Sequence, residues 1–216
     1  MNVRLVTVYS DHEKAPGLPY SRLVEALQDS VARQRMPETV QFLAHKFQPG
    51  FSGEVLENAA QFAAMLARIP VLQKLLNNNS VDVVVWLDAD TLVRGDISQI
   101  WNPKPDWPMI RILRRTYSDE RLKVNTGVIV LFNSPEVQQF LLDWRVETEK
   151  AGIVFYADQI GFQRALEKWE GRIDFPCLSA LYNDSGLNDT ARIWHAKTIT
   201  ERFLVEAGLA MPEMTP

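Results

Sequence analysis

Cysteine is almost absent from this sequence of 216 residues, which contains Cys177 and no other. One thiol cannot form a disulfide within the chain, so the fold must depend on its apolar core. We therefore expect a reducing, cytoplasmic setting, and we interpret Cys177 as a small buried apolar residue rather than a catalytic thiol. Long apolar runs are missing too. No stretch approaches about 18 apolar residues, so we expect no transmembrane segment.

Basic residues are not in excess, because the formal net charge is −4. This balance argues against a broad basic face for binding nucleic acid. A local group of cations nevertheless stands out, and it can be either a solvated loop or a surface that faces an anionic ligand. This group comprises Arg111, Arg114, Arg115, Arg121 and Lys123.

Segments typical of strands and helices alternate along the sequence. Short β-branched runs predict strands, and apolar residues three or four positions apart predict helices. The expected strands are 3–9, 40–47, 81–87, 107–113, 124–132, 172–175 and 191–196, and the expected helices are 20–33, 54–76, 135–150 and 157–169. Because nothing marks a linker, we expect one α/β domain over residues 1–216, with a mixed, mostly parallel sheet.

Several single residues predict where these helices begin, bend or end. Ser134 is expected to cap the helix that starts at Pro135, because serine at this position accepts a backbone hydrogen bond. Pro70 is expected to kink or split the helix over 54–76. Thr198 or Thr200 is expected to cap a last helix. The chain end from Pro212 is expected to be loose.

Two acidic residues follow the most β-branched run of the chain. The run over 81–87 lacks polar alternation, which predicts a central strand covered on both faces, and Asp88 and Asp90 come directly after it. Open α/β sheets bind ligands at this edge, and alternate residues of an extended segment point the same way. Two carboxylates that converge there repel, and a divalent cation relieves the repulsion. The sequence therefore predicts a Mg²⁺ or Mn²⁺ site.

The same motif also fits a haloacid-dehalogenase-like phosphatase. In that class the first aspartate is a nucleophile and the second is a general acid. Such enzymes carry the motif near the N-terminus and need a later acidic pair to complete the Mg²⁺ site. Here two β/α units precede Asp88, and no adjacent acidic pair follows an apolar run downstream. This reading is kept as an alternative.

The segment 83–101, VVVWLDADTLVRGDISQIW, resembles the Asp-x-Asp region of retaining family-8-type glycosyltransferases, the glycogenin and lipopolysaccharide galactosyltransferase group. In that group a further aspartate starts a short helix, and Asp96 fits this role as a helix cap. The resemblance extends over most of the chain and implies the GT-A fold, a nucleotide-diphospho-sugar transferase architecture. Three more segments match in order: VNTGVIVLFN at 124–133, ADQIG at 157–161 and RIWHAK at 192–197.

The resemblance implies roles for these matched residues. Asn125 would hydrogen-bond the donor sugar, Asp158 would contact sugar hydroxyls, and Gln159 would lie near the anomeric carbon. His195 would be the third metal ligand, and Lys197 would contact the diphosphate. The residues alone leave alternatives open, because the Asn-Thr-Gly triplet is also typical of a plain bulge, Asp158 of a helix start and His195 of a core or surface position.

Two matches nearer the N-terminus rest on shorter segments. Thr7 and Tyr9 lie on the strand edge that holds the base and ribose in the family. Arg68 precedes Ile-Pro, and it resembles the arginine before Leu-Pro or Ile-Pro that faces the nucleotide and sugar in the family. Tyr9 can equally be a packed strand residue, and Arg68 a solvated helix residue.

Together these matches imply metal-dependent transfer of a sugar from a nucleotide-diphosphate sugar, with a UDP-sugar as donor, Mn²⁺ or Mg²⁺ as metal, and retention of anomeric configuration. The acceptor stays open among a glycan, a lipid, a protein, a small molecule and a modified nucleic-acid base. A non-catalytic protein that binds sugar nucleotides on the same fold is a further alternative. It predicts donor binding without transfer or hydrolysis.

Overall fold

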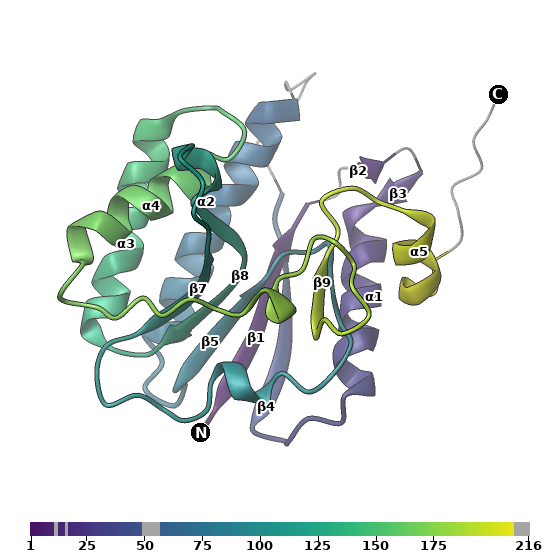
Figure 1. Cartoon of the computed structure of the whole chain (residues 1–216), viewed down its shortest axis with the longest axis horizontal. Coiled ribbons are helices and arrows are strands. Elements are labelled where there is room, and N and C mark those ends of the chain that lie inside the picture. The colour runs from purple at the N-terminus through teal and green to yellow at the C-terminus, as the bar shows by residue number, and fades with distance from the viewer. Residues whose placement is uncertain (11–12, 16, 49–56, 210–216) are drawn as a thin grey trace.

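The computed structural model describes residues 1–216 except 11–12, 16, 49–56 and 210–216. Its central sheet has five strands in the order β4-β1-β5-β8-β7 (Figure 1). The strands are β1 (Val3–Tyr9), β4 (Val40–Lys46), β5 (Val83–Leu87), β7 (Ile110–Arg114) and β8 (Val124–Phe132). β1 pairs parallel with β4 and β5, whereas β8 pairs antiparallel with β5 and β7. The predicted mixed, mostly parallel sheet is therefore confirmed, because only β8 runs against the others.

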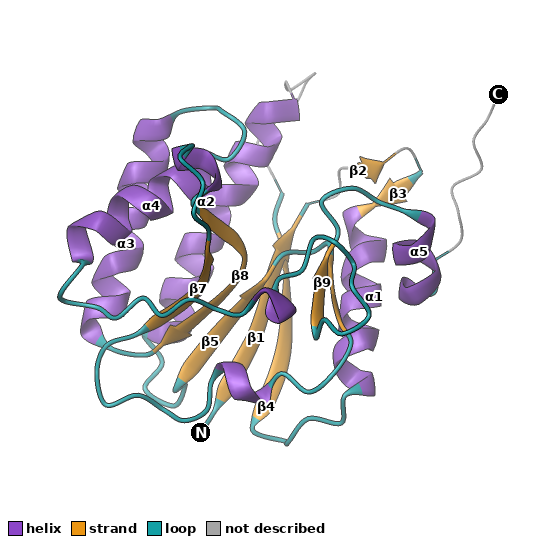
Figure 2. Ribbon diagram, in the orientation of Figure 1, coloured by secondary structure: helices purple, strands orange, loops and turns teal. Residues whose placement is uncertain are grey.

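Helices cover both faces of this sheet (Figure 2). They are α1 (Tyr20–Arg33), α2 (Glu57–Leu76), α3 (Pro135–Ala151) and α4 (Ala157–Trp169), whereas α5 (Glu201–Ala207) packs against α1. One apolar core lies between the sheet and α2, α3 and α4, and a second lies between the sheet and α1. Every residue of β5 is buried, with Val84 and Trp86 in the first core and Val83, Val85 and Leu87 in the second. Apolar side chains on both faces explain the lack of alternation in this run.

Short elements complete the fold beside the sheet. Two pairs of strands are antiparallel: β2 (Glu13–Ala15) with β3 (Leu18–Pro19), and β6 (Thr91–Val93) with β9 (Ile193–His195). Three short 3₁₀ helices are η1 (Ser98–Ile100), η2 (Glu120–Leu122) and η3 (Ala180–Tyr182). The register of β6 and β9 sets Thr91 opposite His195. This pairing brings the late histidine back to the end of β5.

Most predicted elements are confirmed. The caps of α3 and α5 are confirmed too, since Ser134 accepts from the Val137 amide at 3.2 Å, and Thr200, rather than Thr198, caps α5. Asp96 is not the cap residue of η1, because Ile97 occupies that position, although the Asp96 carboxylate accepts from the Ser98 amide at 2.8 Å. The expected helix start over 54–56 and the expected loose end from Pro212 lie outside the described residues.

Three further expectations are wrong. α2 continues past Pro70 without a break, so the helix is not split there, while a kink at Pro70 stays a prediction. Residues 172–175 form no strand but only isolated bridges, such as Asp174 with Met109, because the sheet already ends at β7. Cys177 is exposed rather than buried, and its Sγ lies 3.4 Å from the Leu178 carbonyl oxygen.

Among the described residues, no helix combines the length and apolarity that crossing a membrane requires.

Close packing of α3 against α4 depends on a glycine. A Cβ added at Gly161 would lie 2.5 Å from the Thr148 amide nitrogen and 2.7 Å from its Cα. Alanine in place of glycine ordinarily stabilises a helix by about 1 kcal/mol. Here the overlap involves backbone atoms that cannot turn aside, and such overpacking costs about 1–3 kcal/mol.

We therefore predict that Gly161→Ala lowers the free energy of unfolding by about 1–2 kcal/mol, measured by urea denaturation. Glu167→Ala on the exposed face of the same helix is the control, with an expected change within about 0.5 kcal/mol. A stability gain for Gly161→Ala would show that the two helices separate easily.

Candidate metal and donor site

A tight turn presents the two carboxylates that follow β5. The Thr91 amide donates to the Asp88 carbonyl at 3.1 Å, and the Thr91 hydroxyl donates to the same oxygen at 2.7 Å. The Asp88 amide donates to the Gly127 carbonyl of β8 at 2.8 Å. Asp88 and Asp90 do converge as predicted, but the expected reason was wrong, since a turn rather than extended backbone aims them together. Asp90 is buried, and Asp88 is partly exposed.

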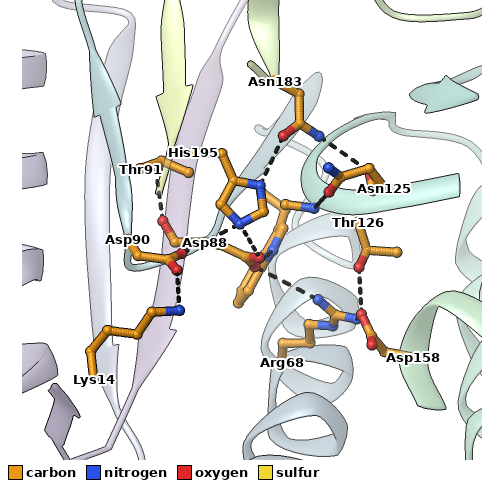
Figure 3. A network of polar contacts seen from close by, with 12 residues as sticks. Lys14, Arg68, Asp88, Asp90, Thr91, Asn125, Thr126, Asp158, Asn183 and His195 are labelled. Carbon is orange, nitrogen blue, oxygen red and sulfur yellow. Dashed lines mark hydrogen bonds and ion pairs between the residues drawn. The ribbon is translucent and has the colours of Figure 1, made fainter. Parts of the chain in front are cut away.

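His195 completes a cluster of three possible metal ligands. Its Nε2 lies 3.4 Å from Asp88 Oδ2 and 3.5 Å from Asp90 Oδ1 (Figure 3). One ligand atom from each residue can be chosen so that all three lie within 4.8 Å of one another. Burial excludes a surface position for His195, and the two carboxylates beside its ring exclude an apolar-core position. The structure thus brings together the three residues that the sequence singled out as metal ligands.

Mutual charge interactions shift the pKa values of Asp88 and His195. Burial raises the pKa of Asp88, but His195, Arg68 and the Trp86 indole together outweigh it, and the pKa lies below its ordinary value. Burial lowers the pKa of His195, but the charges of Asp90 and Asp88 outweigh it, and the pKa lies above 6.5. Without a cation between them, these groups therefore favour a proton on the ring. The same negative potential favours a divalent ion.

Lys14 is a member of the site that the sequence did not reveal. Its Nζ donates to Asp90 Oδ2 at 2.8 Å, on the side away from His195 (Figure 3). Burial lowers the pKa of Lys14, yet Asp90 and Tyr20 raise it by more. Lys14 lies on β2, far from the acidic motif in sequence, and a lysine beside a glutamate carries no local signal of this contact.

A second buried ion pair lies beside the first cluster. Arg68 of α2 is 3% exposed and pairs with Asp158 at the start of α4 through a short hydrogen bond. The same carboxylate accepts from the Thr126 hydroxyl. The Arg68 guanidinium also lies 3.9 Å from Asp88 Oδ1 and stacks on Trp86 and Trp144, with 4.5 Å to the Trp144 centroid. Arg68 is therefore no solvated helix residue but a link between the two acidic groups.

Two residues that line the cavity between these clusters carry buried polar atoms without hydrogen-bond partners. Among the described residues, Asn125 Nδ2 and Gln159 Oε1 are buried without a hydrogen-bond partner, and both residues line the cavity of about 380 Å³. Asn125 Oδ1 already accepts from the Gly127 amide at 3.0 Å, so the amide nitrogen is the free end. Buried polar groups without partners cost free energy, and a polar ligand would satisfy them.

The remaining predicted binding residues divide into two groups. Tyr9 and Lys197 line the cavity, with Lys197 Nζ 5.3 Å from the centre of the Tyr156 ring. Burial and Arg115 lower the pKa of Lys197. Thr7 is fully buried in β1 and is not among the described residues that line the cavity. The local group of cations seen in the sequence includes Arg111, whose guanidinium donates to the backbone carbonyls of Gln99 and Ile100.

The donor set fits a divalent cation such as Mn²⁺. Two carboxylates and one imidazole supply oxygen and nitrogen ligands, which Mn²⁺ accepts. The buried side chains are held by the fold, and Gly127 leaves room for the ring, because a Cβ there would overlap His195. Asp88, Asp90 and His195 would hold the ion.

The buried Arg68–Asp158 pair gives a prediction about stability. We expect Arg68→Met to lower the free energy of unfolding by about 3–5 kcal/mol, because Asp158 is left charged and buried. The double variant Arg68→Met/Asp158→Asn should recover part of that loss, measured by urea unfolding. Equal losses in the single and double variants would mean that the pair contributes only packing.

Comparison with sequences gives no family. No protein-family model matches the chain, and no curated protein matches it.

Solved structures do resemble it. A glycosyltransferase involved in the glycosylation of the major capsid of PBCV-1 has a TM-score of 0.66 at 13% identity, covering 96% of this chain and 98% of that one. The galactosyltransferase LgtC, in complex with donor and acceptor sugar analogues, has a TM-score of 0.61 at 16% identity, covering 97% and 98%. GlyE from Streptococcus pneumoniae TIGR4 has a TM-score of 0.56 at 15% identity, covering 92% of this chain and 55% of that one. These neighbours are GT-A-type glycosyltransferases, LgtC being of family 8, and this chain has their fold.

Proposed function

We propose that the protein transfers a sugar from a nucleotide-diphosphate sugar to an acceptor in a reaction that depends on a divalent metal. One observation carries the proposal: on the GT-A fold, Asp88, Asp90 and His195 form a three-ligand cluster on the wall of a cavity that also holds partnerless polar atoms of Asn125 and Gln159. The three-ligand cluster suits a cation with a diphosphate, and the polar atoms of Asn125 and Gln159 suit sugar hydroxyls.

The positions of the other residues support an arrangement of the donor. Lys197 supplies a positive charge for the diphosphate on the cavity wall near the metal cluster. Asn125, Asp158 and Gln159 face the sugar. Tyr9 lies at the edge proposed for the nucleoside, with uridine as the base. Thr7 is proposed to act only through the backbone of β1, because its side chain is buried away from the cavity.

Charge neutralisation is the main chemical task of this site. Departure of the nucleoside diphosphate builds negative charge on its β-phosphate, and a bound Mn²⁺ or Mg²⁺ supplies the Lewis acidity that stabilises it. Asp158 is held by Arg68 and Thr126, so its carboxylate keeps a fixed orientation beside the sugar. Gln159 and Asp158 would stabilise the cationic ring, and the acceptor would attack on the face of the leaving group, with retention.

Two alternatives are less well supported. A haloacid-dehalogenase-like phosphatase needs a late acidic pair, whereas among the described residues the acidic motif is completed by His195. A non-catalytic protein that binds sugar nucleotides would use the same cavity, so only an experiment separates it from the proposed transferase. For the acceptor, a glycan, a lipid, a protein, a small molecule and a modified nucleic-acid base all stay open. The free thiol of Cys177 supports a reducing, cytoplasmic setting as part of the proposal.

A panel of nucleotide sugars tests the function. With Mn²⁺ present, we expect one or more UDP-sugars to raise the melting temperature and to be hydrolysed slowly without an acceptor. Asp88→Asn and Asp90→Asn should each reduce that hydrolysis by about 100-fold or more while keeping a cooperative thermal transition, because each removes a charge that holds the cation.

Asp82→Asn is the matched control. Asp82 lies just before β5 and pairs with Lys104 at 2.6 Å, at the opposite end of the strand from the cavity, so hydrolysis should be unchanged. Donor binding without hydrolysis or transfer would favour the non-catalytic alternative. Release of phosphate from p-nitrophenyl phosphate, with no response to nucleotide sugars, would favour the phosphatase.

The raised pKa of His195 predicts how metal binding depends on pH. The ring must be neutral to bind a cation, and its pKa in the metal-free protein lies above 6.5. Protons therefore compete with the metal as the pH falls through that raised pKa, and the affinity for Mn²⁺ should fall by about tenfold per pH unit below it. Asp88, whose pKa is lowered, stays ionised in this range.

Calorimetric titration in buffers of different ionisation enthalpy would measure the displaced proton. We expect close to one proton per Mn²⁺ at a pH below that pKa. His45→Gln, which changes a histidine of β4 outside the cluster, should leave the pH dependence intact, whereas His195→Asn should flatten it. Binding of Mn²⁺ without proton release across this range would argue against a histidine ligand.

A further inference from the structure

Asn183 lies beside the metal cluster, and the sequence gave no sign of its role. It follows η3 and is 1% exposed. Its backbone is fixed next to β9, since the Asp184 amide donates to the Ile193 carbonyl at 3.1 Å and the His195 amide donates to the Asp184 carbonyl at 2.9 Å. The side chain points inward, between His195 and Asn125 (Figure 3).

The two hydrogen bonds of this side chain have fixed directions. Asn183 Nδ2 lies 3.2 Å from the backbone carbonyl oxygen of Asn125, and a carbonyl oxygen can only accept. The amide nitrogen must therefore face Asn125, and the amide oxygen must face the imidazole. Asn183 Oδ1 lies 3.0 Å from His195 Nδ1. Because this oxygen can only accept, Nδ1 must carry the hydrogen.

A hydrogen on Nδ1 decides what the other ring nitrogen can do. In the neutral imidazole only one nitrogen is protonated, so Nε2 keeps its lone pair. That nitrogen faces Asp88 and Asp90. The ring has little freedom to turn, because Gly127 packs so closely against it that a Cβ there would overlap the imidazole.

We propose that Asn183 is a positioning residue that holds His195 in the tautomer and orientation needed to bind a divalent cation together with Asp88 and Asp90. Through Asn125 it also ties the metal cluster to the strand that faces the proposed donor sugar. The inference rests on the metal site of the proposed function. Hydrogen-bonded partners of this kind, when removed, typically cost about 10–100-fold in metal affinity.

The test measures Mn²⁺ affinity without nucleotide sugar, from the electron paramagnetic resonance signal of free Mn²⁺. We expect Asn183→Leu to weaken binding by about 10–100-fold. Asn183→Asp keeps an acceptor oxygen for Nδ1 but loses the donor to the Asn125 carbonyl, and it should weaken binding less than Asn183→Leu does. Asn133→Leu is the matched control and should leave the affinity unchanged. The side-chain amide of Asn133 also makes two hydrogen bonds, to the Val81 carbonyl and to the Gln138 side chain, but at the other end of β8.

Each possible result bears on either the role of Asn183 or the metal site itself. Equal affinity in Asn183→Leu and the unchanged protein would overturn the role of Asn183 while leaving the metal site standing. Equal weakening in Asn183→Asp and Asn183→Leu would overturn the role of the acceptor that faces Nδ1. No Mn²⁺ binding by the unchanged protein would overturn both the inference and the proposed metal dependence.

A second measurement needs no variant for its main result. The chain has three histidines, so long-range ¹H–¹⁵N spectra of the metal-free protein can be assigned ring by ring. At a pH where the rings are neutral, we expect His195 to carry its proton on Nδ1. A proton on Nε2 in the unchanged protein would overturn the inference even if Asn183→Leu failed to fold.

Discussion

Repulsion between the carboxylates at the end of β5 is the interaction on which the site depends. Asp88 and Asp90 are brought together by a turn, beside the buried carboxylate of Asp158, where water screens their charges poorly. Cationic groups from separate elements offset this repulsion: Arg68 from α2, Lys14 from β2 and the imidazole of His195 from β9. The remaining place between the ligand atoms is where a divalent ion would complete the balance.

The apolar core makes this arrangement possible. Because both faces of β5 are covered, the strand ends at a fixed position, and the turn after it is held by the backbone of β8 and by Thr91. The β6–β9 pair then returns the chain to the same point. Gly127 lets the ring of His195 lie directly against β8. A tight turn, two helices and two short strands, each held by the fold, therefore carry the residues that must converge.

Much of this was accessible from the sequence, because local patterns reflect local causes. The run over 81–87 and the periodicity of α1 and α4 predicted their elements well, and ordered motifs predicted the cluster at Asp88 and Asp90. Contacts made by the tertiary fold were not accessible: Lys14 and Asn183 reach the site from elements whose sequences show no pattern. Pro70 misled as a signal for a split helix, because α2 runs through it without a break. Cys177 misled because its type favours burial, whereas its loop leaves it exposed.

The guanidinium of Arg68 touches both acidic groups, Asp158 directly and Asp88 at 3.9 Å. A cation bound by Asp88 would compete with Arg68 for that carboxylate and leave Asp158 as the main partner of the guanidinium. Occupation of one half of the cavity thus alters the electrostatic field in the other half. Thermodynamic reciprocity requires that a ligand which engages Asp158 also changes the affinity for the ion. A cation at Asp88 and a ligand at Asp158 would therefore be energetically coupled through the one side chain of Arg68.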